Sequence, residues 1–348
     1  MKKICFVLPR LTNMSSPIVG LSLLINHLAN KYHVLVIGVL EDKSHNLFLF
    51  NNTNIVVLRE KTLYQKMRKV KKFNPDIIIS SLFQSDIFSS FFFSNVKKIS
   101  MVRSDILLNY CYDQGYFKGS LMYVLHALSL SRFQKVIALS SQNASRLIFT
   151  EDNKIKIIRN FFHETNQSTS ERINNDYIHL VFAGHLTKRK GILNLIKTIN
   201  YVTKKNINVK LTVLGKGPLM EKIENYIISN RLQKNIILMG YVDNVLPFIK
   251  RAHYSILPSY SEGTSRFILE SLHSGKKVIV RNTSGIDEVL NKENAYLFNT
   301  DDQLKKTIRT LFNSKIFKKD PCKNYPKIFD KNTNLHKIEE EIRTLINK

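Results

Sequence analysis

Thirteen short apolar runs, rich in Ile and Val, limit the fold of this sequence more than any other feature. Most of them, such as residues 3–8 and 178–184, do not alternate between polar and apolar positions. Short continuous apolar runs are typical of strands that are buried on both faces of a parallel sheet. Between them lie stretches with helical spacing, for example 18–30 and 190–204, which suit crossover helices. This order predicts a doubly wound α/β architecture.

The length of the chain indicates two such domains. At 348 residues it exceeds the roughly 250–300 residues at which a single hydrophobic core usually stops growing. A polar segment poor in aliphatic residues separates the seventh run from the eighth, so we expect a linker at 166–176. We therefore expect an N-terminal domain at 1–165, a second domain at 177–318 and a C-terminal segment at 319–348. Apolar positions in that last segment recur at helical spacing.

The sequence contains no recognisable targeting or spanning segment. The N-terminal apolar run breaks at Pro9-Arg10 without a small-residue cleavage site, which favours a strand over a signal peptide. No apolar stretch approaches the roughly 20 residues of a spanning helix. We expect a cytoplasmic protein, either soluble or peripheral on the inner face of the cell membrane. Cys5, Cys111 and Cys322 form no CxxC pair, which argues against disulfides and against a zinc site.

The formal net charge of +26 is spread along the chain. Residues 1–170 carry 22 Lys and Arg against 10 Asp and Glu, and residues 171–348 carry 31 against 17. The excess of Lys and Arg over Asp and Glu has two equally good explanations, a biased amino-acid composition and a role in binding anions. A functional excess would favour phosphates, acidic lipid surfaces or nucleic acid. The charge is the only feature that supports a basic nucleic-acid-binding protein. The sequence contains no recognised nucleic-acid module that would add to it.

Two loops of the second domain bring cations or glycines to the start of a helix. In open α/β sheets, ligands bind beyond the carboxyl ends of the strands, where helix N-termini present N–H groups to anions. The first loop, "AGHLTKRKGI", supplies Lys188, Arg189 and Lys190. The second, "LGKGPL", contains Gly215 and Gly217. Taken alone, "GKG" is more often a turn than a phosphate site.

A third loop leads into "EGTSRFILESLHSG", which predicts a short helix that begins near Thr264 or Ser265 and ends before Gly275. Its apolar residues share one arc, so Glu270 points to the opposite side, away from the core. The arc comprises Ile268, Leu269 and Leu272.

The two acids that flank this helix start suit hydroxyl groups rather than phosphates. A diphosphate on the N–H groups of residues 263–265 would leave Glu270 roughly 9 Å further along the helix. There its carboxylate could accept two hydrogen bonds from a ribose. Glu262 would reach a sugar hydroxyl on the other side of the diphosphate, and the cations and the helix terminus would bind the phosphates.

Four segments, in this order, resemble the C-terminal domain of retaining, nucleotide-sugar-dependent glycosyltransferases of family 4. They are "FAGHLTKRKGI", "LTVLGKGPL", "IILMGYVDNV" and "LPSYSEGTSRFILESLHSGKKVIV". The resemblance implies the GT-B fold, in which two Rossmann-like doubly wound domains face a central cleft. It also implies that the C-terminal helix packs back on the N-terminal domain. Within the family, the chain resembles enzymes that build bacterial capsule, O-antigen or lipid-linked oligosaccharide.

The resemblance implies a role for each matching residue. Lys190 would bind the donor pyrophosphate and stabilise the departing diphosphate, and Glu262 would contact the transferred sugar, so these two are the catalytic candidates. Glu270 would bind the ribose, and the backbone of Gly263, Thr264 and Ser265 would hold phosphate. The base would lie near Gly215, Gly217, Tyr241 and Val242.

The chain departs from the family pattern in both domains. His185 stands where an Arg usually follows the Gly of the first loop, so either Lys188 or Arg189 compensates or the leaving group is stabilised less well. In the first domain, Ser16 lies where family members carry a Gly-Gly loop near the sugar and the acceptor. Arg103 and Asp105 are further acceptor-side candidates, because they lie where the family places acceptor-side residues.

The implied activity is transfer of one sugar, with retention, from a nucleotide diphosphate sugar to a glycan or lipid-linked acceptor. A UDP-sugar is the favoured donor, the sugar is of hexosyl or N-acetylhexosaminyl type, and no metal or other cofactor is expected. The alternatives are a GT-B nucleotide-sugar epimerase or an inverting transferase and, from another class, the basic nucleic-acid-binding protein.

Each site residue also has a structural interpretation. Glu270 could pair with Arg266 at i,i+4 on an exposed helix face, and Glu262 could be a charge at a helix N-terminus. Lys190 could be solvated, and His185 could be a packed loop residue.

Residues 64–73 form a basic helix candidate, and residues 87–98 combine aromatic residues with lysines. Both could dock on an anionic membrane surface by charge and shallow aromatic insertion. The alternative is a solvated charge run and a buried core helix.

Overall fold

The computed structural model describes residues 1–11, 16–40, 52–58, 62–161, 176–263, 265–283, 286, 290–322 and 329–347, without the side chains of 16–19, 318 and 319. The chain forms two compact units. Unit 1 is Met1–His163 together with Ile328–Lys348, and unit 2 is Glu164–Lys327. The linker expected at 166–176 lies outside the described residues except for Asp176.

Unit 1 contains a seven-stranded sheet in the order β3-β2-β1-β4-β5-β6-β7, with every neighbouring pair parallel. The chain order reverses at β1, which lies between β2 and β4. The strands are β1 (Lys3–Leu8), β2 (His33–Gly38), β3 (Ile55–Leu58), β4 (Ile77–Ser80), β5 (Lys97–Val102), β6 (Lys135–Ala138) and β7 (Ile155–Ile157).

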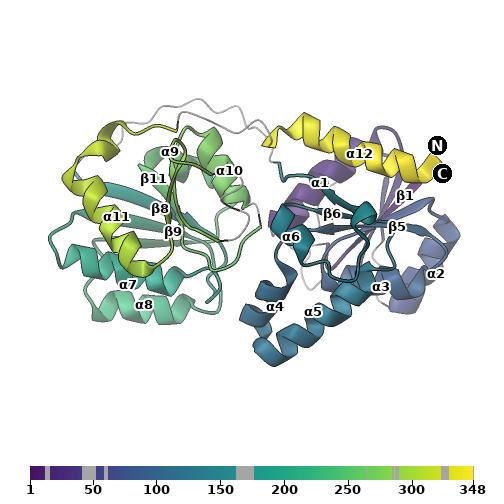
Figure 1. Ribbon diagram of the computed structural model, residues 1–348, viewed down its shortest axis with the longest axis horizontal. Helices are drawn as coiled ribbons and strands as arrows, with labels where there is room; N and C mark the ends of the chain where they lie inside the picture. The colour runs from purple at the N-terminus through teal and green to yellow at the C-terminus, as the bar shows by residue number, and fades with distance from the viewer. Residues whose placement is uncertain are drawn as a thin grey trace. The chain divides into compact units, whose positions relative to one another are not determined.

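Helices cover both faces of this sheet (Figure 1). On one face, α1 (Ser16–Ala29) and α12 (Lys331–Asn347) pack over a shared core. On the other face lie α2 (Leu63–Phe73), α3 (Phe83–Phe92) and α5 (Tyr116–Leu130). The remaining helices are α4 (Ile106–Gln114), α6 (Ser141–Ser145) and the 3₁₀ turn η1 (Asp152–Lys154).

The last helix, α12, joins unit 1 although it lies at the end of the sequence (Figure 1). Its apolar residues Leu335, Ile338, Ile342 and Leu345 are buried in the core beneath α1. Glu339 is also buried, and its carboxylate accepts hydrogen bonds from Lys31 at 2.8 Å and from Arg343 at 3.2 Å and lies 3.0 Å from His27 Nε2. Burial opposes ionisation of Glu339, but the hydrogen bonds from these side chains and the charge of Lys31 outweigh it and hold the pKa of Glu339 at about 2.

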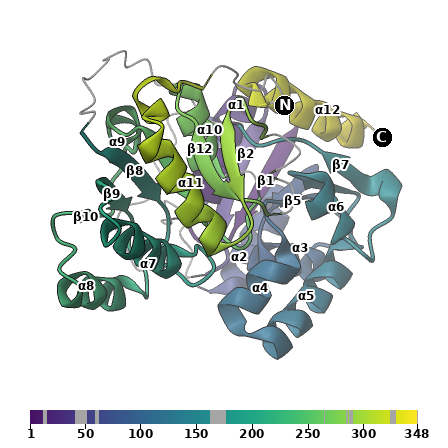
Figure 2. The same ribbon diagram turned by 60° about the vertical axis from the view of Figure 1, so that its left-hand side comes forward.

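Unit 2 contains a six-stranded parallel sheet in the order β10-β9-β8-β11-β12-β13. The strands are β8 (Ile178–Ala183), β9 (Val209–Leu214), β10 (Ile236–Gly240), β11 (Tyr254–Leu257), β12 (Val278–Arg281) and β13 (Ala295–Phe298). The helices, several of which Figure 2 labels, are α7 (Ile192–Thr203), α8 (Met220–Ser229), α9 (Leu246–Arg251), α10 (Arg266–His273), α11 (Asp301–Asn313) and the 3₁₀ turn η2 (Ile316–Lys319).

The prediction of two doubly wound α/β domains with parallel sheets is confirmed, and all thirteen apolar runs form strands. Central strands such as β4 and β11 are buried along their whole length, which explains why their sequences do not alternate. The edge strands β3 and β10 are partly exposed. Within the described ranges, no helix has both the length and the apolar character that crossing a membrane would require.

Candidate active site

Three loops of unit 2 meet at the carboxyl edge of its sheet. They follow β9, β8 and β11, which are neighbours in the sheet. Backbone hydrogen bonds continue beyond the strands, from Gly184 N–H to the Leu214 carbonyl at 2.9 Å and from Leu186 N–H to the Lys216 carbonyl at 3.0 Å. The loop after β8 is bonded in the same way to the loop after β11, since Tyr260 N–H donates to the Arg189 carbonyl at 2.8 Å.

Three glycines allow these loops to approach so closely. Gly215 has a φ of +139°, and a Cβ on it would collide with the carbonyl of Gly184. Gly191 has a φ of +66°, and a Cβ there would collide with the carbonyl of Pro258. Gly217 is similarly tight against the backbone of Leu186. Both glycines of "GKG" are therefore explained by loop packing, and a part in donor binding remains a prediction.

An ion pair between Lys190 and Glu262 joins the first and third loops. Both side chains are largely buried, at 14% and 8% exposed. Arg189 reaches the same place, and its Nη1 donates to the carbonyl of Ser261 at 3.0 Å. Burial alone would raise the pKa of Glu262, but the Lys190 ammonium and the Arg189 guanidinium outweigh burial and hold it below its usual value. The expectation that Lys190 and Glu262 act at one place is consistent with this geometry, and the alternative of a solvated Lys190 is wrong.

Helix α10 begins and ends near the expected residues. Ser265 is its N-cap, and Gly275, at a φ of +73°, follows its C-cap. Gly275 N–H donates to the Leu272 carbonyl and Lys276 N–H to the Ser271 carbonyl, both at 3.0 Å, which is a Schellman ending. Among the described residues, the Ser265 side chain accepts no capping hydrogen bond from the first turn. The end of α10 at Gly263 and Ser265 thus offers N–H groups to an anion, whereas Thr264 lies outside the described residues.

Glu270 lies on the side of α10 opposite its apolar arc, but it is buried, with only 7% of its surface exposed. The expected orientation away from the apolar core is therefore observed, but the side chain is not exposed there. Arg266 Nε donates to Glu270 Oε1 at 2.8 Å, so the i,i+4 pair forms, on a buried carboxylate rather than on an exposed face. Burial raises the pKa of Glu270, and Arg266 only partly opposes that rise.

Tyr241 follows β10, and burial together with Asp243 raises the pKa of its hydroxyl, which the Arg266 guanidinium only partly opposes. The ring is half exposed. That Tyr241 flanks a base remains a prediction. Val242 is partly buried against the core of unit 2. His185 is exposed, so the alternative of a packed loop residue is wrong.

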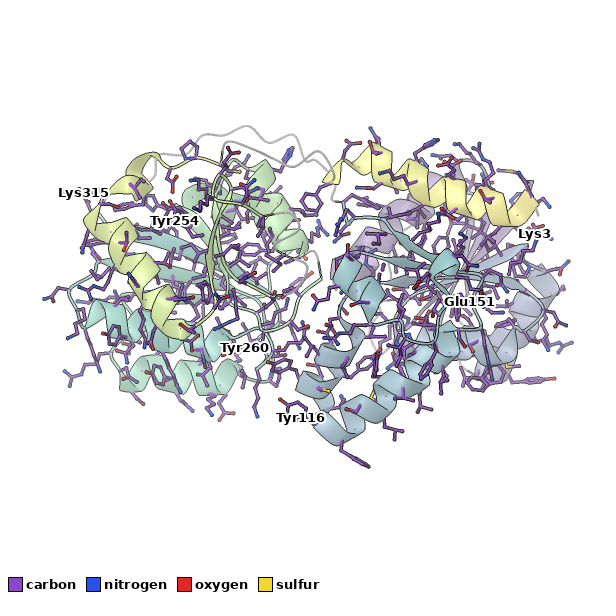
Figure 3. The ribbon with its side chains drawn as sticks, in the orientation of Figure 1. Lys3, Tyr116, Glu151, Tyr254, Tyr260 and Lys315 are labelled. Atoms are coloured by element: carbon purple, nitrogen blue, oxygen red, sulfur yellow. The ribbon has the colours of Figure 1, made fainter. Side chains whose placement is uncertain are left out.

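Arg281 is a positioning residue that the motifs do not indicate. Its guanidinium donates to the carbonyls of Pro258 at 3.2 Å and Asn299 at 2.7 Å, pairs with Asp301, and lies 4.5 Å from the ring centre of Tyr260. Figure 3 labels Tyr260, which continues the third loop after β11. Arg281 therefore supports the loop that carries Glu262. A buried strand, β12, that ends on a charged residue is the only sequence signal for it.

The acceptor-side candidates of unit 1 are held in structural contacts. Arg103 is buried and donates to Asn160 Oδ1 at 2.7 Å, and burial lowers its pKa to about 10. Asp105 is the N-cap of α4, accepting from Leu108 N–H at 2.9 Å and from Arg146 Nε at 3.2 Å. The side chain of Ser16 lies outside the described residues.

The protein consists of two Rossmann-like domains. In one of them, loops that carry cations and lead into a helix lie at the carboxyl edge of the sheet. This is the GT-B class of glycosyltransferase fold. The family model of glycosyl transferases group 1 matches residues 163–329, which span unit 2.

The curated proteins that this chain resembles are named as glycosyltransferases. The chain is 26% identical over 241 residues to an uncharacterized glycosyltransferase of Methanocaldococcus jannaschii, covering 63% of this chain and 58% of that protein. It is 23% identical over 251 residues to the capsular polysaccharide biosynthesis glycosyltransferase CapM of Staphylococcus aureus, covering 66% of each. It is 24% identical over 292 residues to the O-antigen biosynthesis glycosyltransferase WclY of Escherichia coli, covering 80% of each. The matches to three Methanocaldococcus relatives span 58%, 48% and 41% of their lengths.

Solved structures share the fold over the whole chain. A sucrose-phosphate synthase of Thermosynechococcus elongatus aligns with a TM-score of 0.82 at 14% identity and covers 100% of both chains. The Anabaena protein HepE in complex with UDP-glucose aligns with a TM-score of 0.80 at 17% identity, covering 99% of this chain and 100% of that one.

Proposed function

We propose that this protein is a retaining glycosyltransferase that moves one sugar from a UDP-sugar to a glycan or lipid-linked acceptor in bacterial surface polysaccharide synthesis. The observation that carries the proposal is the Lys190–Glu262 pair beside the start of α10, with Glu270 further along the same helix. This arrangement provides a cation, helix N–H groups and two acids in the order that a nucleotide diphosphate sugar needs.

The phosphates fit the positive end of this cluster. The Lys190 ammonium has three donors, so it can keep its bond to Glu262 and still donate to a phosphate oxygen. The N–H groups at Gly263 and Ser265 supply further donors, strengthened by the helix dipole. Fixed positive groups of this kind stabilise a departing diphosphate without rearrangement as its charge develops. His185 and Arg189 stand at the same edge as further candidates for this diphosphate.

The hydroxyl groups fit the acids. Glu262, with its pKa held low, is a carboxylate at neutral pH and can accept hydrogen bonds from the sugar. Glu270 lies five residues, or about 7.5 Å along the helix axis, from the N-cap, which suits a ribose attached to the diphosphate. Tyr241, Val242 and the glycine loop at 215–217 then lie where a base would follow the ribose.

The donor and the acceptor class are supported by similarity. HepE, with the same fold, was crystallised with UDP-glucose, and CapM and WclY are named for capsule and O-antigen synthesis. The cationic groups at the site support binding of the diphosphate without a metal, and the transferred sugar is proposed to be of hexosyl or N-acetylhexosaminyl type. Arg103, Asp105 and Ser16 are the residues of unit 1 proposed for the acceptor side.

Isothermal titration with UDP, GDP and ADP tests the proposal directly. We expect UDP to bind most tightly and Lys190→Met to weaken that binding, with Lys222→Met, an exposed lysine on α8, as the matched control. Absence of binding for all three nucleotides would refute it. NMR of the product anomer then separates retention from an inverting transferase or an epimerase, and a gel shift that survives physiological salt would favour the nucleic-acid alternative.

A further inference from the structure

The outward side of helix α5 in unit 1 is apolar and exposed. Helices α4 and α5 form a hairpin whose tip is Gly115, at a φ of +84°, followed by Tyr116, which is 84% exposed and labelled in Figure 3. Five apolar side chains of α5 fall within an arc of about 100° at 3.6 residues per turn. They are Phe117 (89% exposed), Leu121 (54%), Val124 (38%), Leu125 (47%) and Leu128 (47%).

This helix therefore has two apolar sides, of which the sheet covers one. Tyr123, Ala127 and Leu130 are buried against β5 and β6. A helix that is apolar all round is ordinarily buried all round, and a contiguous exposed apolar patch marks an interaction site on most soluble proteins. The five outward residues of α5, which we call the α5 apolar face, therefore need an apolar partner.

Hydrogen bonds hold the hairpin in place. His126 Nε2 of α5 lies 2.8 Å from Asp86 Oδ2 of α3, and its Nδ1 lies 2.7 Å from the hydroxyl of Tyr110 in α4. The Tyr123 hydroxyl donates to the Arg146 carbonyl at 2.9 Å. All three links lie on the inner side, so the apolar face is presented by an anchored helix.

Basic residues surround the apolar face within the same helix layer. Lys118 and Arg132 are exposed beside it, and the Arg132 guanidinium lies 4.8 Å from the ring centre of the exposed Phe91 on α3. Helix α2 lies in the same layer (Figures 1 and 2), and its sequence LYQKMRKVKKF has five cations and no acid. Arg68 and Lys72 lie opposite its buried Val70, so they point away from the sheet.

We propose that this layer of unit 1 docks on an anionic lipid bilayer. The α5 apolar face, with Phe91, lies at the boundary between headgroups and acyl chains, and α2 lies on the anionic headgroups. Amphipathic helices bind membranes in this way by combining apolar burial with charge attraction.

The charge distinguishes a lipid surface from a second copy of the chain as the partner. Two copies packed through this face would bring together two cationic α2 helices in a protein of net charge +26, whereas an anionic bilayer attracts both the helix and the whole protein.

The structure also changes which segment inserts. The sequence offers residues 64–73 and 87–98 as possible membrane segments, but most of α3 is buried, and of its apolar residues Phe91 and Phe92 at its end are exposed. Helix α2 contributes charge rather than apolar contact. Its Val70 and Lys66 are buried against the protein, and its other cations are exposed. The α4–α5 hairpin, which the basic and aromatic pattern does not indicate, supplies the apolar contact.

A single tryptophan can report insertion, because the chain has none of its own. In the full-length protein, Phe117→Trp should show a blue shift of its emission when phosphatidylglycerol vesicles are added. Ile228→Trp, at a residue 61% exposed on α8 of unit 2, should show no shift. Equal shifts, or none at Phe117→Trp, would overturn the proposal.

Co-sedimentation with the same vesicles measures the two contributions separately. We expect Phe117→Ser with Leu121→Ser to weaken partitioning at least about tenfold, given the apolar contribution of each side chain. Arg68→Gln with Lys72→Gln should weaken it about fivefold for each charge removed at low salt. Ile228→Ser with Ile237→Ser, which removes two exposed apolar residues of unit 2, should change nothing.

Each alternative gives a distinct result. Binding that is equal on pure phosphatidylcholine and insensitive to salt would overturn the anionic partner. A wild-type dimer in sedimentation velocity that the Phe117→Ser, Leu121→Ser variant converts to a monomer would identify a second copy as the partner instead. UDP titration of each variant confirms an intact fold, so failure of the membrane proposal is distinguishable from failure of the proposed activity.

Discussion

Unit 1 and unit 2 contain the same kind of parallel sheet, but some of their buried charges lie in different places. In unit 1, Asp86 accepts from Ser80 and Ser100 and contacts His126 inside the helix layer, and Glu339 lies beneath α12. In unit 2, Lys190 and Glu262 lie in loops at the carboxyl edge of the sheet. Charges in the first arrangement attach helices to a sheet, whereas those in the second can exchange partners with a ligand.

The same difference separates the candidate acceptor residues of unit 1 from the candidate nucleotide site of unit 2, both of which follow the ends of strands. Arg103 and Asp105 follow β5 in unit 1, and their hydrogen bonds go to Asn160, the first turn of α4 and Arg146. At α10 in unit 2, the N-cap side chain forms no capping bond among the described residues. Where the N-cap side chain accepts a hydrogen bond from the first turn of a helix, fewer N–H groups remain for an anion. Where it does not, those N–H groups stay available. The comparison therefore supports the proposal that nucleotide chemistry belongs to unit 2.

The largest expected effect comes from Lys190→Met, which removes the largely buried cation that pairs with Glu262 in unit 2. We expect transfer to fall at least about 100-fold, the usual cost of losing one group that stabilises developing charge. The variant also leaves Glu262 buried without its main partner, so the protein should unfold more easily. Turnover of the donor and a thermal unfolding curve measure the two effects.

A double variant separates these two effects. Lys190→Met combined with Glu262→Gln removes the uncompensated charge, so stability should recover while transfer remains lost. Recovery of transfer would show that Lys190 acts only as a structural partner of Glu262, and the comparison between the units would fail.

Acid should affect unit 2 before unit 1. Burial lowers the pKa of His253 to about 4. Protonation of this imidazole therefore favours the unfolded state, and the free energy of unfolding falls as the pH is lowered from 6.5 towards 4. The loss amounts to about 2–3 kcal/mol. Glu339 has its pKa lowered to about 2, so its contribution to unit 1 is lost only as pH falls from about 4.5 towards 2.

Hydrogen exchange of peptides from each unit, measured at pH 7 and at pH 5, checks the order. His253→Asn keeps an acceptor for the His179 N–H, which donates to His253 Nδ1 at 2.9 Å, and should remove most of the acid sensitivity of unit 2. Simultaneous opening of both units in the wild type would contradict the separate assignment.

Glu270 should give a smaller effect that depends on pH. Glu270→Gln should weaken UDP binding about tenfold, since one charge-assisted acceptor is lost. In the wild type, burial raises the pKa of Glu270, so UDP affinity should begin to fall, as pH is lowered, at a higher pH than for an ordinary Glu. The variant should lack this dependence, and titration across pH 5 to 8 measures both. An identical pH profile in the variant would remove Glu270 from the nucleotide site.

Much of the fold could be predicted from the sequence because the relevant information is local. The strands are buried on both faces, so their composition alone marks them, as in residues 77–80 and 254–257. The helix at 266–273 is likewise bounded by residues that lie beside it in the chain, Ser265 and Gly275.

What could not be predicted depends on contacts between distant residues. Arg281 supports the third loop by bonding to Pro258, which is far from it in sequence. Glu270 is opposite the apolar arc of its helix, yet neighbouring elements bury it, which periodicity cannot reveal. The apolar residues of α5 surround the helix, and their spacing does not tell which side the sheet covers.

The smallest effect separates a helix cap from an acceptor contact at Asp105 in unit 1. Asp105→Ala should lower the free energy of unfolding by about 1 kcal/mol, because the first turn of α4 loses its cap, whereas Asp105→Asn keeps a capping oxygen and should change it by only a few tenths. Ser140→Ala, which removes the cap of α6 bonded to Asn143 N–H at 3.0 Å, is the matched control. If Asp105 serves only as a cap, Asp105→Asn also leaves transfer unchanged. Slow transfer in a fully stable Asp105→Asn protein would instead place acceptor chemistry at this carboxylate, and unit 1 would then share the chemistry that the comparison gives to unit 2.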